Sequence, residues 1–526
     1  DSHERRLGET LCAALPGIPV LLLCEVLPQV REFDRPSTTA LCAYVGPILE
    51  SYLTQLQTAV PGLGLPNLHI MGSTGGVFDV KEALRIPVNS IESGPAAGVI
   101  AAQLIGFQIN EPNLISFDMG GTTAKASLIR DGEIEITAEY EVGGSGSQNR
   151  WVTGTGHPIR VPVIDLAEVS AGGGSIAWVD PAGSLRVGPS SAGAEPGPVC
   201  YGQGGTEPTV TDANLVLGYL DANSLLDGGL PIDYNRAVQA LAEKIGNPMN
   251  MDTQTAAAAI REIVNNGMAE ALRIVSIERG HDPREFCLVA FGGAGPLHAA
   301  ALAEELEIPR VIVPPIPGGF SALGLVGTDV RRDYARTLYQ PLSDLEARDI
   351  SAVWSELITD GKNMLKESGI PASRWQFHRS ADLRYTRQAY ELNVTADEGQ
   401  FTTTAKDQLA DRFHARHKQT YGHQNPNEPV HLVTLRLTAV GKLDRLEITH
   451  RPDPIGNSEK SRRSAWFADA GTVECAVHDR SRLNATSRLT GPAIVESLDS
   501  TLVIPPGWSA SNDHRGFITM ERHHNE

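Results

Sequence analysis

The sequence is short of basic residues and has no long apolar run. Its 44 lysines and arginines stand against 63 acidic residues, which gives a net charge of −19. A chain this acidic, without a basic stripe, is a poor partner for nucleic acid or for an anionic membrane surface. No apolar stretch approaches the roughly 20 residues that a transmembrane helix needs. The composition therefore excludes nucleic-acid binding and membrane insertion as expected functions.

Cysteine is also scarce. The six cysteines are scattered and form no Cys-x-x-Cys pair, so we expect reduced thiols in a cytoplasmic protein. Only Cys200 lies beside a glycine-rich loop. We expect it to be inert, because a functional thiol needs a lowered pKa. A signal peptide and an initiator methionine are both missing, and the sequence opens on a polar helix, so we expect that something upstream has been lost.

Glycine and proline are plentiful, with 52 and 34 residues in a chain of 526. This length predicts about three domains. The pattern of apolar residues indicates an α/β segment over 1–110 and an α/β domain over 111–335 that holds the main glycine-rich loops. From about residue 336 to 526 the pattern favours a separate α+β domain with antiparallel strands.

The most informative motif is Asp118-Met-Gly-Gly-Thr-Thr-Ala-Lys125, entered from the apolar run 114–117. A second run at 126–129, closed by Asp131-Gly132, predicts a β-hairpin. Glycines at the tip let a ligand approach the backbone, and their N–H groups suit a phosphate together with the threonine hydroxyls. Asp118 would hold Mg²⁺ directly or through water. The alternative is a plain hairpin with a glycine-rich tip.

Three further elements rich in small residues accompany this hairpin. They are a helix containing Gly94-Pro-Ala-Ala-Gly98, a strand–turn–helix over 289–298, and the stretch Gly319 to Leu325. Their order resembles the actin/sugar-kinase/Hsp70 ATPase superfamily, in which two RNase-H-like lobes clamp ATP. The resemblance implies a first connecting helix, a phosphate loop, an adenosine loop and a second connecting helix, with the two helices crossing closely at a hinge.

Longer sequence segments point to a narrower family. They are similar to the hydantoinase A / 5-oxoprolinase family, which includes N-methylhydantoinases, and the similarity runs from about residue 3 to the end of the chain. The segments that carry it are 25–35, Ser93–Gly98, Phe117–Lys125, Ala171–Ile176, Gly205–Asn214, Phe291–His298, Ser321–Leu325, Asp382–Tyr385 and Gly491–Ile494.

Two features depart from this family. Its members usually begin with another lobe of roughly 200 residues that carries its own phosphate loop, far longer than any ordinary connection. The sequence lacks that lobe, so the chain would hold half of an ATP clamp unless the lobe is disordered, cleaved or supplied by another chain. In addition, Lys125 stands where oxoprolinase-like members tend to have an acidic residue, and it looks more like the N-methylhydantoinase or ketone-carboxylase branches.

The resemblance implies ATP-dependent ring opening of a cyclic amide such as a hydantoin, N-methylhydantoin or lactam. Phosphorylating the carbonyl oxygen would make the unreactive amide open to attack by water. ATP and Mg²⁺ are the implied cofactors, and a hydantoinase B-like subunit in a hetero-oligomer is the implied partner. The alternatives are a subunit of an ATP-dependent ketone carboxylase of the acetone or acetophenone type, and a catalytically inactive scaffold.

The resemblance, together with the carboxylates beside the glycine loops, gives the candidate site residues. Asp118, which also serves as the expected metal ligand, is joined by Asp165 and Glu207 as candidate catalytic carboxylates. For Asp165 the alternative is a strand-end residue that caps a turn, and for Lys125 it is a solvated loop end. The expected cofactor-binding residues are Gly120, Gly121, Thr122, Thr123, Lys125, Gly172, Gly173, Gly174, Gly292, Gly293 and Gly295.

Other polar residues have simpler interpretations. Asp212 is a base, a metal ligand or only the N-cap of a helix, and His298 suits helix packing. His414 and His417 lie three residues apart on an expected helix and have no carboxylate beside them, so we expect a surface position and no metal site. The polar connection 143–147 is expected to be mobile.

Overall fold

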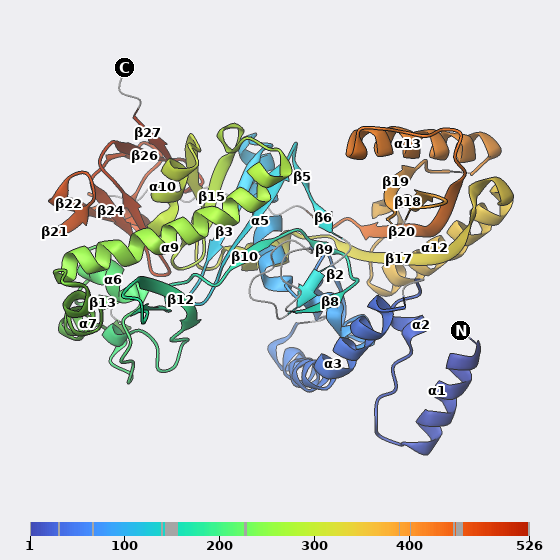
Figure 1. Cartoon of the computed structure of the whole chain (residues 1–526), viewed down its shortest axis with the longest axis horizontal. Helices are drawn as coiled ribbons and strands as arrows, with labels where there is room; N and C mark the ends of the chain where they lie inside the picture. The colour runs from blue at the N-terminus through green and yellow to red at the C-terminus, as the bar shows by residue number, and fades with distance from the viewer. Residues whose placement is uncertain are drawn as a thin grey trace.

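The computed structural model describes residues 2–29, 32–65, 68–137, 140–142, 156–225, 229–388, 390–399, 401–444, 448 and 456–523. The connection expected at 143–147 lies outside these residues. Figure 1 shows an elongated molecule whose two largest sheets lie in its two halves. Within the described ranges, no helix combines the length and apolar character that crossing a bilayer requires.

The larger sheet has nine strands and is mixed. The expected hairpin forms from β3 (Leu114–Met119) and β4 (Ala124–Arg130), and β3 runs parallel to β15 (Cys287–Phe291), which runs parallel to β16 (Arg310–Val313). Every residue of β15 is buried, as expected for a strand covered on both faces. The other strands are β10 (Ala167–Val169), β5 (Glu133–Ile134), β27 (Ile518–Arg522), β26 (Trp508–Asn512) and β23 (Arg488–Thr490).

Helices cover both faces of this sheet. Leu288 and Ala290 share a core with α6 (Val210–Val216), α9 (Thr253–Val275) and α10 (Gly295–Glu305). Val289 and Phe291 point to the opposite face and pack with α5 (Ser93–Ile109) and with Phe320 of α11 (Phe320–Gly327). Alternate residues of one strand thus supply two cores, which confirms the α/β class expected for this part of the chain.

The second sheet has six strands in the order β1-β2-β17-β20-β18-β19. Its long strands β17 (Val330–Pro341), β20 (Val430–Gly441) and β18 (Trp375–Tyr385) pair antiparallel, and α12 (Ala347–Glu367) and α13 (Thr403–Tyr421) pack on it. The remaining strands are β1 (His69–Met71), β2 (Val77–Asp79) and β19 (Leu392–Ala396).

The strand pairing connects parts of the chain that lie far apart in sequence. In the second sheet, Val77 of β2 pairs with Val330 of β17. In the first sheet, β27 pairs antiparallel with β16. The division into three domains at residues 110 and 335 stays a prediction. The first sheet draws strands from both sides of residue 335, and the second sheet draws strands from both sides of residues 110 and 335.

A third, four-stranded sheet packs against the first. It contains β21 (Glu459–Phe467), β22 (Gly471–Asp479), β24 (Ala493–Glu496) and β25 (Thr501–Ile504), and its buried residues belong to the core around α9 and α10. The other elements are α1 (Ser2–Ala14), α2 (Leu23–Val26), α3 (Asp34–Ala59), α4 (Val80–Arg85), α7 (Tyr234–Leu241), α8 (Asn247–Met249), β6 (Ile136–Thr137), β7 (Tyr140–Val142), β8 (His157–Ile159), β9 (Val163–Ile164), β11 (Ser175–Val179), β12 (Leu185–Ser191), β13 (Ser224–Leu225) and β14 (Leu230–Pro231).

The helices α5 and α11 cross at glycines. A Cβ atom on Gly324 would lie 1.8 Å from the carbonyl oxygen of Ala97, and one on Gly98 would lie 2.6 Å from the ring of Phe291. Real Cβ atoms do not approach other atoms this closely, so both positions require glycine. The close packing that the small residues predicted is confirmed.

The Gly324→Ala variant tests this crossing. The added methyl group must separate the two helices, so we expect the free energy of unfolding to fall by about 3 kcal/mol in urea titrations. Gly267→Ala is the matched control, because Gly267 is an exposed residue of α9 with no atom within 4 Å of an added Cβ. It should raise stability by about 0.5–1 kcal/mol. Equal stabilities of the two variants would contradict the tight crossing.

Candidate functional site

The tip of the β3–β4 hairpin is open to solvent. Asp118 pairs with Lys125 and Met119 with Ala124, and the tip itself is closed by a 3.2 Å hydrogen bond from the Gly120 N–H to the Thr123 carbonyl. Gly120 and Gly121 are exposed, and a Cβ on either would have no atom within 4 Å. The space over the two glycines is therefore free for a ligand.

A second glycine loop, residues 172–174, packs against the backbone of the tip. The N–H groups of Gly173 and Gly174 donate to the carbonyls of Gly120 (3.0 Å) and Gly121 (2.6 Å), and the Gly172 N–H donates to Ser175 Oγ at 2.9 Å. A Cβ on Gly172 would lie 2.5 Å from the carbonyl carbon of Gly121. Since all three N–H groups are already used, this loop shapes the tip rather than offering donors to a ligand.

The bend between β15 and α10 lies against the same hairpin. The Ala294 N–H donates to the Met119 carbonyl at 3.0 Å. Gly292 has a φ of +81°, and its Cβ would lie 2.5 Å from Asp118 Oδ1. Because β3 and β15 are parallel neighbours, tip and bend meet at the carboxyl ends of the strands, where open α/β sheets usually bind ligands. The two loops that the sequence predicted to cooperate do lie together.

Asp118 is the carboxylate that the structure brings to this meeting point. Burial raises the pKa of Asp118 above its ordinary value, and the positive charge of Lys125 opposes that rise. Among the described residues, no group of three or more histidines, cysteines and carboxylates could hold a metal ion. A single carboxylate suits Mg²⁺ that is bound mainly by the phosphates of a nucleotide and by water.

Lys125 links the hairpin to the start of α5. Its Nζ lies 2.8 Å from Glu92 Oε2 and 3.5 Å from Glu168 Oε1, and its side chain is only 17% exposed, so it is not a solvated loop end. Burial lowers the pKa of Lys125, but the hydrogen bonds and charges of Glu92 and Glu168 together outweigh burial and raise it overall. Sequence reasoning missed Glu92, because only its left-handed φ of 61° turns this residue at the helix entry toward the hairpin.

The other two candidate carboxylates are paired elsewhere. Asp165 forms an ion pair with Arg279, and its carbonyl accepts the hydroxyl of Ser127 in the middle of β4. Glu207 lies 2.7 Å from Lys244 Nζ, and both side chains are more than 40% exposed. The structure thus brings Asp118 to the base of the hairpin tip, whereas Asp165 and Glu207 are engaged in ion pairs with Arg279 and Lys244.

Asp212 and Cys200 have structural roles. Asp212 is fully buried at the third position of α6, where it forms a capping box with Thr209 and accepts the Cys200 N–H at 2.8 Å. Asp212 therefore caps the start of α6 as part of the capping box, although the N-cap residue itself is Thr209. Burial, reinforced by the charge of Asp212, raises the pKa of the Cys200 thiol far above its usual range. The expectation of an inert thiol agrees with this environment.

The three histidines considered from the sequence, His298, His414 and His417, contact other side chains of the protein. His298 is fully buried, with Nδ1 2.6 Å from Asn265 Oδ1, and burial lowers its pKa well below the ordinary value. His414 Nδ1 lies 2.7 Å from the Tyr385 hydroxyl. His417 is also fully buried, between Gln388 and the carbonyl of His423. The expected surface position is therefore wrong for His417, because the aromatic rings around it cover that helix face.

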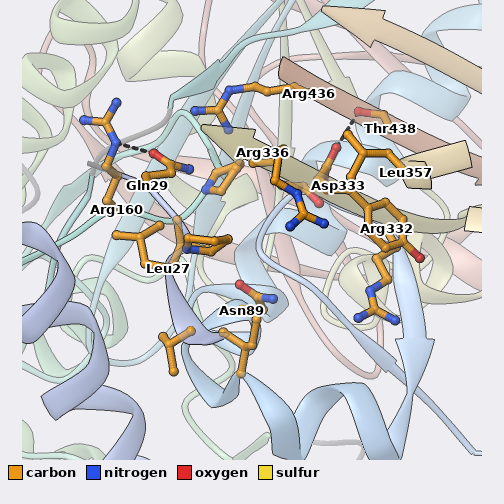
Figure 2. Close-up of a pocket in the computed structure, with 18 of the residues that line it drawn as sticks. Leu27, Gln29, Asn89, Arg160, Arg332, Asp333, Arg336, Leu357, Arg436 and Thr438 are labelled. Carbon is orange, nitrogen blue, oxygen red and sulfur yellow. Dashed lines mark hydrogen bonds between the residues drawn. The ribbon is translucent and has the colours of Figure 1, made fainter. Parts of the chain in front are cut away.

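A cavity of about 1200 Å³ lies between the N-terminal segment and the second sheet (Figure 2). Much of its charged lining is paired internally: Arg436 lies 2.7 Å from Asp382, and Arg332 lies 2.7 Å from Glu82. Figure 2 also shows the 2.8 Å hydrogen bond from Arg160 to Gln29. The described lining of this cavity includes no residue of the hairpin tip or the bend, so the cavity and the open space over Gly120 and Gly121 are separate features.

Comparison with family models places the chain clearly. Residues 35–334 match the model described as hydantoinase/oxoprolinase, and residues 343–523 match the hydantoinase/oxoprolinase C-terminal domain. Together the two matches cover most of the chain, including the hairpin and the bend.

Individual proteins agree. An uncharacterised protein of Methanocaldococcus jannaschii is 41% identical over 99% of this chain and 75% of its own length. Caprolactamase subunit alpha of Pseudomonas jessenii is 34% identical over 97% of this chain and 73% of its own length. The crystal structure of the ATP-dependent caprolactamase from that organism has a TM-score of 0.80, with 33% identity, over 99% of this chain and 75% of that one.

A second solved structure is similarly close in shape. The nucleotide-free structure of acetone carboxylase, from a study of ATP-dependent acetone carboxylation, has a TM-score of 0.82 at 26% sequence identity. It covers 99% of this chain and 74% of the acetone carboxylase chain. Both solved structures carry the same overall fold.

Gly292 and Gly293 offer a direct test of the contact between bend and hairpin. Gly292→Ala places a methyl group against the Met119 carbonyl and the Asp118 carboxylate, so we expect a loss of about 2–4 kcal/mol in unfolding free energy. Gly293→Ala is the neighbouring control, because its Cβ would lie no closer than 3.6 Å to another residue. Thermal and urea unfolding should separate the two variants, and a Gly292→Ala variant as stable as wild type would disprove the contact.

His298 predicts a pH dependence of stability. Because its pKa is depressed in the folded state, the unfolded chain binds the proton more readily, and stability must fall as pH drops below about 6.5. One such histidine contributes roughly 1.4 kcal/mol between pH 7.5 and pH 5.5. Urea titrations at both pH values should show a smaller decrease for His298→Gln than for wild type; an unchanged decrease would contradict the buried neutral imidazole.

Proposed function

The chain belongs to the hydantoinase/oxoprolinase family, and on this premise we propose that it opens a cyclic amide ring with the consumption of ATP. The expected substrates are hydantoins, N-methylhydantoins and lactams. Caprolactam is itself a cyclic amide, and the P. jessenii relative is more similar in sequence to this chain than acetone carboxylase is, at 33% against 26% identity. That difference favours amide hydrolysis over carboxylation.

One observation carries the proposal: the open hairpin tip touches the bend at the end of β15. In the proposal, the N–H groups of residues 121–123 and the hydroxyls of Thr122 and Thr123 hold the terminal phosphates of ATP, while Gly120 keeps the backbone open to them. Residues 292–295 hold the adenosine side. Asp118 holds Mg²⁺ that arrives with the nucleotide. The open space over Gly120 and Gly121 supports this assignment, since no atom lies within 4 Å of a Cβ there and the backbone is free for the approach of a phosphate.

The remaining expected site residues have supporting parts in this proposal. Gly172, Gly173 and Gly174 fix the shape of the tip through the hydrogen bonds to Gly120 and Gly121. Lys125 fixes the hairpin against α5 through Glu92 and is close enough to the tip in sequence to reach a phosphate if that ion pair opens. Asp165 and Glu207 remain predicted catalytic residues, whose ion pairs with Arg279 and Lys244 would have to open for catalysis.

The chemistry needs positioning more than covalent catalysis. ATP would transfer its γ-phosphoryl group to the carbonyl oxygen of the ring and leave as ADP. One water then adds to the activated carbon, and the ring C–N bond breaks as the nitrogen takes up a proton, which leaves an acyl phosphate. A second water cleaves the acyl phosphate to a carboxylate and inorganic phosphate. The chain contributes fixed backbone donors that stabilise charge on the phosphoryl oxygens as it develops. Backbone donors held by a second glycine loop cost little reorganisation at the moment of transfer.

A partner subunit is part of the proposal. The P. jessenii relative is named as subunit alpha of a caprolactamase, which supports a hetero-oligomer for this chain as well. We expect the partner to be a hydantoinase B-like subunit. Carboxylation of a ketone is the second candidate, because the acetone carboxylase structure is as similar in shape as the caprolactamase structure.

The test is a phosphate-release screen on the protein purified with its native partner. With Mg²⁺ and ATP, we expect hydantoins or lactams to stimulate phosphate release without bicarbonate. Stimulation only by acetone or acetophenone together with bicarbonate would select the carboxylase alternative. If the complex neither binds ATP nor releases phosphate with any substrate, the chain is a scaffold and the proposal fails.

Gly121→Val connects the screen to the hairpin. The substitution should leave folding intact, because no atom lies within 4 Å of the new Cβ, but it should reduce phosphate release by about a hundredfold by displacing the phosphate. Gly62→Val, at another glycine with open space around its Cβ, is the matched control and should keep wild-type turnover. Equal activity of the two variants would remove the hairpin from the mechanism.

A further inference from the structure

A turn from the third sheet reaches the bend. The turn between β24 and β25, residues 497–500, presents Asp499 to the loop that follows β16. Asp499 Oδ2 accepts the Gly318 N–H at 2.7 Å, and a Cβ on Gly318 would lie 2.9 Å from Asp499 Cβ. The carbonyl oxygen of Asp499 would be 3.6 Å from a Cβ on Gly293. The turn and the bend are therefore side by side.

A half-buried arginine fixes this arrangement. Arg480 is in the segment between β22 and β23, and its Nη2 donates to the carbonyls of Val313 (3.0 Å), Pro314 (2.6 Å) and Gly516 (3.2 Å). Burial lowers the pKa of Arg480 to about 10, and the negative charge of Asp499 opposes that shift. A guanidinium that binds three carbonyls holds the end of β16 against the third sheet.

The turn is also ordered internally. Ser497 Oγ lies 3.1 Å from Asp499 Oδ1 and donates to the Ser500 carbonyl at 2.9 Å, while the Ser497 N–H donates to the same carbonyl at 3.0 Å. Asp499 therefore accepts the Gly318 N–H at Oδ2, and its Oδ1 accepts at most the Ser497 hydroxyl, whose single proton is shared with the Ser500 carbonyl. An ionised carboxylate has about four acceptor positions, so about two remain for hydroxyl groups of a ligand.

Two large apolar side chains stand uncovered on the same pair of loops. Leu498 is 65% exposed in the turn, and Ile316 is 55% exposed in the loop that Asp499 holds through Gly318. A single exposed apolar residue needs no explanation. Here two of them lie on loops that the Asp499 carboxylate joins beside the bend, and this carboxylate still has free acceptor positions. This combination suits a ligand with a flat apolar ring and neighbouring hydroxyl groups.

We propose that the 497–500 turn and the Ile316–Gly318 loop form the nucleoside wall of the site: Asp499 accepts the ribose hydroxyls, and Leu498 and Ile316 contact the base. This inference rests on the proposed function, which places the phosphates on the hairpin. It adds that the third sheet, which supplies no phosphate-binding loop, selects a nucleoside triphosphate over inorganic polyphosphate.

The test separates the wall from the hairpin by using two ligands. Calorimetric titration of the whole chain, with Mg²⁺, measures the affinity for ATP and for inorganic tripolyphosphate. The wall predicts that Leu498→Ser weakens ATP binding by about tenfold, the effect of losing one apolar contact, and leaves tripolyphosphate binding unchanged. Leu63→Ser is the matched control, because Leu63 is a similarly exposed leucine at 73% exposure in the N-terminal segment.

The ribose contact has its own test. Wild type should bind ATP about tenfold more tightly than 2′,3′-dideoxy-ATP, because the missing hydroxyls leave the carboxylate without its donors. Asp499→Asn should bring that ratio close to one, and thermal unfolding checks that the turn still folds.

The outcomes distinguish failure of the wall from failure of the proposed function. Three results would overturn the wall. In Leu498→Ser, they are an unchanged affinity for ATP, or an equal loss of affinity for ATP and for tripolyphosphate. In Asp499→Asn, it is a ratio of ATP affinity to 2′,3′-dideoxy-ATP affinity equal to that of wild type. Wild-type binding of tripolyphosphate without any preference for ATP would overturn the wall and leave the hairpin standing. Failure of the wild-type chain to bind either ligand would overturn the proposed function and the wall together.

Discussion

The site depends on one contact, between the Met119 carbonyl and the bend that follows β15. The Ala294 N–H reaches this carbonyl only because Gly292, in a left-handed conformation, brings the backbone against Asp118 with no side chain between them. This contact sets the distance between the hairpin tip and the start of α10. Without it, the glycine-rich tip would be an isolated loop, and no second element would define where a ligand extends from the phosphate position.

Much of this arrangement was predictable because glycine placement is visible in a sequence. The hairpin followed from two apolar runs around a turn, and the close crossing of α5 and α11 followed from their small residues. Both depend on local chain geometry: a Gly-rich tip between strands, or a helix face without side chains, has few alternative structures. The parallel pairing of β3 and β15 then placed tip and bend at one edge of the sheet.

The parts that sequence reasoning missed depend on partners far along the chain. Lys125 looked like a free cation because Glu92 lies 33 positions away and reaches it through an unusual backbone angle. The burial of His417 requires Tyr385 and Phe413 to be packed around it. The loop at 172–174 was expected to contact the ligand, whereas the N–H groups of Gly173 and Gly174 donate to the hairpin and that of Gly172 to Ser175. Glycine patterns alone do not show which way a loop faces.

The sheet that carries the site has an unusual order of assembly. Its β16 strand is flanked on one side by β15, which is close in sequence, and on the other by β27, which arrives only after the whole second sheet and the third sheet have been made. During synthesis on a ribosome, that edge of β16 waits unpaired while the intervening segments emerge. Pairings between segments so distant in sequence form slowly, so the unpaired and aggregation-prone strand edge stays exposed for longer than one paired by a neighbouring segment. Chaperone protection of this edge would therefore matter most in the interval before the final strand docks.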